Sequence, residues 1–199
     1  CVIVRIARTE GRGSQERATT AGTLVKDRKG LDTVGITARN EGTWGNDITV
    51  EVVLPPPSVQ TFLTADLNPG DHSCVVKSSR GFDRGSIVRI YDGEAEACVV
   101  LSRVQAKTLE WSPEDAVTRK FRAAAPTYLE PLEFEIRASN SEMKEVFNAL
   151  SFSPLSERHF ERVVNQHSLL IRAEDFESSS PLPWSLPSAL PPTKLSGGM

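Results

Sequence analysis

The chain has 199 residues, of which 39% are apolar and 25% charged, and this is the composition of an ordinary globular protein. Its formal net charge of −3 provides no general attraction for nucleic acid or for an anionic membrane surface. Its apolar runs are far shorter than the roughly 20 residues that a membrane-spanning helix needs, and no signal-peptide core follows the first residues. We therefore expect a protein that neither binds nucleic acid nor inserts into a membrane.

Strand-like runs dominate the first part of the chain, and three prolines end it. Short β-branched runs predict strands at residues 2–6, 22–25, 33–38 and 47–53, with a polar loop at 9–20. Prolines 55–57 exclude both helix and central strand, because proline has no backbone N–H. We expect residues 1–54 to form the first part of a domain.

The middle of the chain, residues 58–126, contains short strands separated by turns. The predicted strands are residues 75–76, 87–91, 97–101 and 108–111. Asp92-Gly93 between two of them is a strong hairpin signal. No helical periodicity lies between these strands, so the segment is expected to be a small antiparallel barrel or sandwich inserted into the surrounding domain.

Residues 130–176 add the helical part of the predicted fold. Residues 132–138 alternate between apolar and charged, which predicts a strand with one face buried. Ser153-Pro154 is a typical helix start, and an apolar stripe follows it; residues 141–152 also fit a helix, although their pattern is ambiguous. The predicted class is α+β, a discontinuous mixed α/β domain carrying an inserted all-β module. Residues 177–199, rich in proline and serine, are predicted to be a linker or tail.

The side chains that carry most enzyme chemistry are scattered in the sequence. The three cysteines, Cys1, Cys74 and Cys98, are too few and too far apart for a disulfide framework or a zinc site, which favours a reducing compartment. His159 and His167 are eight residues apart, too far to share a metal. We therefore predict a protein that is not an enzyme and needs no metal or cofactor.

Because the chain starts at Cys1 and ends in a proline-rich stretch, we interpret it as a piece of a longer polypeptide.

The stretch ARNEGTWGND, residues 38–47, needs a specific explanation. Gly42 and Gly45 permit positive φ, and Asn46 can bond neighbouring backbone groups. Trp44 offers a large apolar side chain whose N–H needs a partner when buried. Two interpretations stay open: the loop is a structural staple that sets the register of the next strand, or part of it also faces a neighbouring subunit.

ITARNEGTWGNDITVEV resembles the Ala-Arg-x-x-Gly-x-Trp-Gly-Asn signature that precedes a strand in contractile tail sheath proteins. The matching residues are Arg39, Gly42, Trp44, Gly45 and Asn46. FNALSFSPLSERHFERVVNQHSLLIRAE is similar to a second segment of that family, in which a Leu-Ser stretch is followed by a helix and a strand. CVIVRIA and AGTLVKD are similar to the family's approach to the first motif.

The resemblance implies a mechanical function. A sheath subunit polymerises into a helical homo-oligomer around an inner tube and contracts to drive the tube through a target envelope. Its partners are copies of itself, the inner tube protein and the baseplate, and it resides in the cytoplasm during assembly and then in a virion tail or an injection-system particle. The family's terminal arms and tube-contacting region are not recognisable in this sequence.

A competing hypothesis assigns a binding function to the inserted module. Phe82, Tyr91 and Trp111 would form an aromatic platform for a glycan or a receptor. Alternatively, the same three side chains fill the core of the small barrel. The two alternatives predict opposite degrees of burial for these aromatic residues.

Overall fold

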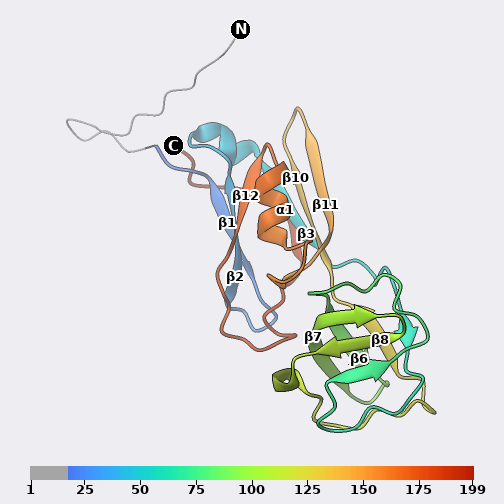
Figure 1. The fold of residues 1–199 in the computed structure, drawn as a ribbon. Helices are drawn as coiled ribbons and strands as arrows, with labels where there is room; N and C mark the ends of the chain where they lie inside the picture. The colour runs from blue at the N-terminus through green and yellow to red at the C-terminus, as the bar shows by residue number, and fades with distance from the viewer. Residues whose placement is uncertain (1–17) are drawn as a thin grey trace. The chain divides into compact units, whose positions relative to one another are not determined.

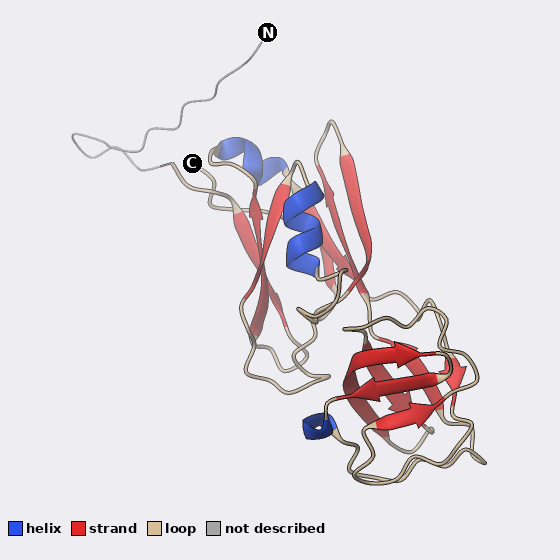
Figure 2. Cartoon of the chain, viewed as in Figure 1, coloured by secondary structure: helices blue, strands red, loops and turns tan. Residues whose placement is uncertain are grey.

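The computed structural model describes residues 18–199, so Cys1 and the strand predicted at residues 2–6 lie outside the described part of the chain. The fold is mostly β (Figure 2), with 42% of the described residues in strands and 9% helical. This corrects the predicted α+β class: within residues 18–199, curled antiparallel sheets and a single α-helix replace a mixed α/β domain. The chain divides into two compact units, a first unit of residues up to 53, 135–148 and 161–199, and a second unit of residues 54–134 and 149–160.

A three-stranded antiparallel sheet forms one part of the first unit (Figure 1). Its strands, in spatial order, are β1 (Gly22–Lys26), β2 (Asp32–Ala38) and β12 (Ile171–Asp175). The central strand β2 is almost wholly buried, since it pairs with β1 on one side and with β12 on the other. Residues far apart in sequence therefore meet in this sheet.

A four-stranded antiparallel sheet forms the other part of the first unit. Its order is β11 (Lys144–Leu150), β10 (Phe134–Ser139), β3 (Thr49–Val53) and β13 (Leu190–Lys194). Alternation places Val50 and Val52 of β3, and Ile136 and Ala138 of β10, in the core. The helix α1 (Phe160–His167) buries Val163 and Val164.

The segment predicted to be a linker, residues 177–199, packs into the first unit. Within it, β13 pairs with β3 through Leu190–Val52 and Thr193–Val50. A register irregularity accompanies the two prolines of β13, which are tolerated because this strand is at the edge of the sheet. Leu195 is only 2% exposed, so the apolar residues of this segment contribute to the core.

The second unit is a small barrel of short antiparallel strands. Its strands are β4 (Thr61–Phe62), β9 (Tyr128–Pro131), β6 (Ile87–Tyr91), β7 (Glu96–Gln105), β8 (Thr108–Trp111) and β5 (Ser73–Val75), in that spatial order. A bridge between Leu63 and Val76 joins the two outer strands. The backbone N–H of Thr64 donates to the Val75 carbonyl at 2.9 Å, and the curled sheet thereby closes on itself.

The helical prediction after Ser153 was wrong in its position. Residues 153–159 form successive turns, because the hydroxyl groups of Ser153 and Ser156 accept hydrogen bonds from backbone N–H groups two residues later. Such local bonds compete with a continuous helix, which begins only at Phe160. The ambiguous stretch 141–152 contains β11, which follows a turn held by the side chain of Asn140.

Candidate functional site

The 38–47 loop forms a tight turn ended by a short 3-10 helix, Thr43–Asp47. Gly42 has a φ of 116°, a conformation that side chains disfavour, so a glycine is required there. Its N–H donates to the Thr19 carbonyl at 3.1 Å, and the Ile48 N–H donates to the Gly45 carbonyl at 3.2 Å. These hydrogen bonds fix the end of the loop directly before the first residue of β3.

Gly45 is the buried centre of this loop. A Cβ atom at this position would lie 2.7 Å from the Cβ of Ala38 and 3.0 Å from that of Ala21. Both distances are shorter than carbon atoms adopt without displacement. The second glycine of the motif therefore serves close packing, and its φ is not the reason for its presence.

Asn46 binds the last residues of the chain. Its Nδ2 donates to the Gly198 carbonyl at 3.0 Å, and its Oδ1 accepts from the Gly198 N–H at the same distance. Thr19 and Met199 exchange backbone hydrogen bonds beside this pair. The side chain of Asn46 therefore acts as a piece of backbone that holds residues 197–199 against the loop.

Trp44 lies at the surface of the loop and does not enter the core. Its ring is half-buried, and its Nε1 donates to the carbonyl of Glu41 at 3.1 Å within the same loop. The buried contact that holds the loop is the close approach at Gly45. Part of the indole remains accessible to solvent.

Arg39 links the loop to the second segment that carries the sheath resemblance. Its Nη1 donates to the Asn165 carbonyl at 3.3 Å, and its backbone N–H donates to the Leu170 carbonyl at 2.8 Å. Asn165 in turn brackets Ala173 of β12, donating to its carbonyl at 2.8 Å and accepting from its N–H at 2.9 Å. Arg39 and Asn165 are 126 residues apart in the sequence, and their contact joins the two resembling segments within the first unit.

Ser168 and Glu145 form a further tie that sequence reasoning missed. The Ser168 hydroxyl donates to Glu145 Oε2 at 2.6 Å and accepts from the N–H groups of Leu170 and Ile171. Glu145 Oε1 accepts from the Leu169 N–H at 2.8 Å. This contact connects β11 to the turn after α1. The sequence did not predict it, because the two residues are brought together only by the folding of distant segments.

Asp27 is a second anchor that the sequence did not reveal. Its carboxylate accepts hydrogen bonds from the N–H groups of Lys29 and Leu31 and from the Ser178 hydroxyl. Burial alone would raise the pKa of this carboxyl group, but the hydrogen bonds outweigh burial and lower it well below its ordinary value. The turn after β1 is thereby fastened to the proline-rich segment.

The aromatic residues proposed as a ligand platform are mostly in the barrel core. Phe82 is 3% exposed and Trp111 is 2% exposed, and both pack in the main hydrophobic cluster of the barrel. Tyr91 is on the outer face, where its hydroxyl donates to Glu130 at 3.1 Å and accepts from Gln60 at 2.7 Å. The three rings therefore do not form a common surface.

Tyr91 belongs to a polar network on the outside of the barrel. Burial, and after it the hydrogen bond to Glu130, raises the pKa of the Tyr91 phenol above its ordinary value. The Arg89 guanidinium lies 4.5 Å from the centre of the Tyr91 ring and binds Glu96 at 2.8 Å. Glu96 belongs to β7, which is an inner strand of the sheet.

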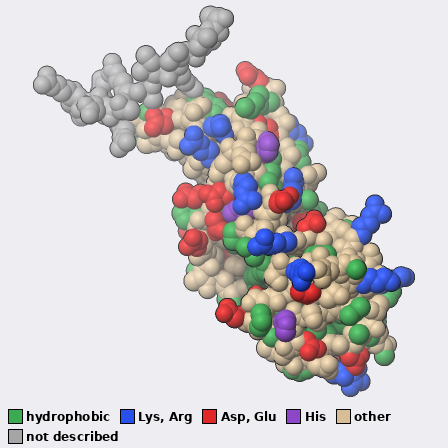
Figure 3. Space-filling model, in the orientation of Figure 1, with side chains coloured by type: hydrophobic (Ala, Val, Ile, Leu, Met, Phe, Trp, Pro, Cys, Tyr) green, Lys and Arg blue, Asp and Glu red, His purple; other side chains and the backbone are tan. Residues whose placement is uncertain are grey.

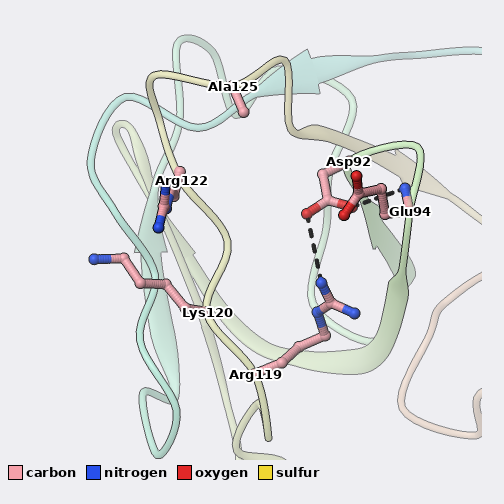
Figure 4. Close-up of a pocket in the computed structure, with 6 residues that line it drawn as sticks. All are labelled: Asp92, Glu94, Arg119, Lys120, Arg122 and Ala125. Atoms are coloured by element: carbon pink, nitrogen blue, oxygen red, sulfur yellow. Dashed lines mark hydrogen bonds and ion pairs between the residues drawn. The ribbon is translucent and has the colours of Figure 1, made fainter.

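A pocket of about 480 Å³ opens beside the β6–β7 hairpin. Its lining residues are Asp92, Glu94, Arg119, Lys120, Arg122 and Ala125. Figure 4 shows Arg119 reaching from the 119–125 segment toward Asp92, with their ion pair drawn as a dashed line. Sequence reasoning interpreted Asp92 only as a turn residue, although the Arg119-Lys120-Phe121-Arg122 cluster was a visible signal.

The remaining titratable candidates lie apart from one another. His159 is buried beside Phe160, with their rings 5.0 Å apart, and His167 ends α1. Burial raises the pKa of the Cys74 thiol to about 12, which keeps it protonated and unreactive. Within residues 18–199, no group of three His, Cys, Asp or Glu side chains has an arrangement suited to a metal ion.

No protein-family model matches the sequence, and no curated protein matches it.

In the described part of the chain, every helix is too short or too polar to cross a membrane. On the face of the molecule seen in Figure 3, basic side chains are spread among acidic and neutral ones.

Proposed function

We propose that this chain is a structural subunit of a contractile tail sheath, which polymerises around an inner tube and contracts to drive that tube through a target envelope. The observation that carries the proposal is the contact between Arg39 and Asn165. It joins the Trp-Gly-Asn loop to the second segment that resembles the sheath family. A resemblance in two separate segments is stronger support when their residues form one local structure.

The loop has the mechanical property that such a subunit requires. Gly45 fixes the loop by close packing, and Asn46 fixes the end of the chain by two hydrogen bonds. A contracting lattice changes by repacking the contacts between subunits, so each subunit must transmit force without deforming. The 38–47 loop, held by these contacts, supplies this rigidity without any catalytic group.

An outer strand of the part of the chain that the structure describes provides a surface for the polymerisation. The strand β11 is outermost in the four-stranded sheet, and its Val146 is 49% exposed. An outer strand presents backbone donors and acceptors that can pair with a strand from another chain. The proposed partners are copies of this chain, the inner tube protein and the baseplate, first in the cytoplasm and then in a virion tail or an injection-system particle.

A charge on β11 tests the proposal directly. Val146→Asp should abolish sedimentable assemblies of the chain expressed with a tube partner, because an ionised group on an edge strand opposes strand pairing. The matched control is Val75→Asp, which alters an exposed valine of the barrel strand β5. If Val146→Asp and the unaltered chain sediment alike, or if neither chain assembles, this proposal is wrong.

A further inference from the structure

We propose that the barrel binds an acidic saccharide in the pocket between the β6–β7 hairpin and residues 119–125. The pocket of about 480 Å³ lies within the range of about 300–1,000 Å³ that is usual for small-ligand sites. Its lining joins basic groups from the 119–125 segment with acidic groups from the hairpin. This binding function is separate from polymerisation and does not use the buried aromatic residues.

The basic side of the pocket has N–H donors that can hold an anionic group. Arg119 Nη2 lies 3.8 Å from Asp92 Oδ2, which is longer than the roughly 2.7–2.9 Å of a tight charged hydrogen bond. An arginine has five N–H donors, so Arg119 can bind a ligand carboxylate and keep its neighbour. Arg122 is exposed at the same pocket, whereas Lys120 is already paired with Asp66 at 2.8 Å.

The acidic side of the pocket distinguishes a saccharide from a simple anion. The Asp92 carboxylate accepts hydrogen bonds from the Glu94 and Ala95 N–H groups, and these bonds lower its pKa, so the group is ionised at neutral pH. Ionised carboxylates only accept hydrogen bonds. They repel an anion that carries few hydroxyl donors, such as phosphate or a glutamate peptide, but they accept hydrogen bonds from hydroxyl groups. A uronic acid unit, with one carboxylate for the basic side and several hydroxyl groups for the acidic side, matches both sides.

A second hollow extends the proposed site along the hairpin. It measures about 200 Å³, and its lining includes Arg89, Tyr91 and Glu96. Glu94 lines both hollows, so a chain of sugar units can pass from one to the other. The ligand is therefore expected to be an oligosaccharide of uronic acids, and a trimer should bind more tightly than a single unit.

Calorimetric titration of the full 199-residue chain with a galacturonic acid trimer tests the site. Arg122→Gln should weaken binding by about tenfold, because it removes a charged hydrogen bond to the ligand. Glu94→Ala should weaken binding at least threefold, since the ligand's hydroxyl groups lose an acceptor. Arg84→Gln is the matched control, because it removes the same charge from an exposed position outside the pocket and should leave the affinity unchanged.

Neutral and non-sugar probes decide the class of ligand. A neutral galactose trimer, inorganic phosphate and a glutamate peptide should each bind at least tenfold more weakly than the uronic acid trimer. Equal binding of any of these probes would overturn the proposal, as would no binding of the trimer or unchanged binding by Arg122→Gln. The titration requires no assembled lattice, so its result is independent of the proposed sheath function.

Discussion

Replacing Asn46 by alanine should release the end of the chain from the 38–47 loop. The substitution removes both hydrogen bonds to Gly198, each 3.0 Å long. A net contribution of about 0.5–1.5 kcal/mol for each bond predicts a loss of about 1–3 kcal/mol in the free energy of unfolding. Urea titration followed by circular dichroism measures this loss, and hydrogen exchange should show that the Gly198 N–H has lost its protection.

A double-mutant cycle separates this contact from a general effect of the substitution. In a chain that lacks residues 197–199, Asn46→Ala should cost less than about 0.5 kcal/mol, because its partner is already gone. Asn68→Ala, at an exposed position of the barrel, is the control and should cost a similarly small amount. Full additivity of Asn46→Ala with the deletion would show that Asn46 does not stabilise the protein through Gly198.

Four further substitutions or measurements probe the packing and the charges of the fold. Gly45→Ala should reduce the free energy of unfolding by about 1–3 kcal/mol through overpacking against Ala38, and an unchanged urea midpoint would contradict this explanation. Phe82→Ala should cost about 3–5 kcal/mol in the barrel's own transition, measured by calorimetry. The Cys74 thiol should react with a thiol reagent at pH 8 only after unfolding, and stability should fall as the pH rises from about 9 towards 12, because only the unfolded thiol ionises there. The lowered pKa of Asp27 predicts stability that is present above its unfolded pKa and lost as the pH falls, and Asp27→Asn should weaken this acid dependence in urea titrations at pH 3 and 6.

The strands that were predicted correctly depend on local signals. The hairpin around Asp92-Gly93 joins β6 and β7 as expected, because the turn chemistry and the flanking alternation belong to neighbouring residues. The β3 strand likewise begins shortly after the Trp-Gly-Asn loop. In both places the preference of the backbone and the burial pattern point to the same structure.

The errors arose where distant partners decide the structure. Helical spacing in residues 141–152 was overridden by pairing of β11 with β10, and the proline-rich end became a strand because β3 offers it an edge. The pocket combines Asp92 with Arg122, thirty residues later, and sequence spacing alone does not bring them together. The Arg39–Asn165 contact depends in the same way on long-range pairing.

Electron microscopy of the chain expressed together with a candidate tube protein tests the sheath proposal most directly. We expect helical tubes or stacked rings around the inner tube, in a long narrow state and a shorter wider one. Arg39→Ala should reduce the number of such particles, because it removes the hydrogen bond to the Asn165 carbonyl that stabilises the subunit. Arg84→Ala should leave the number of particles unchanged. Monodisperse monomers under all conditions that preserve the inner tube would contradict the account.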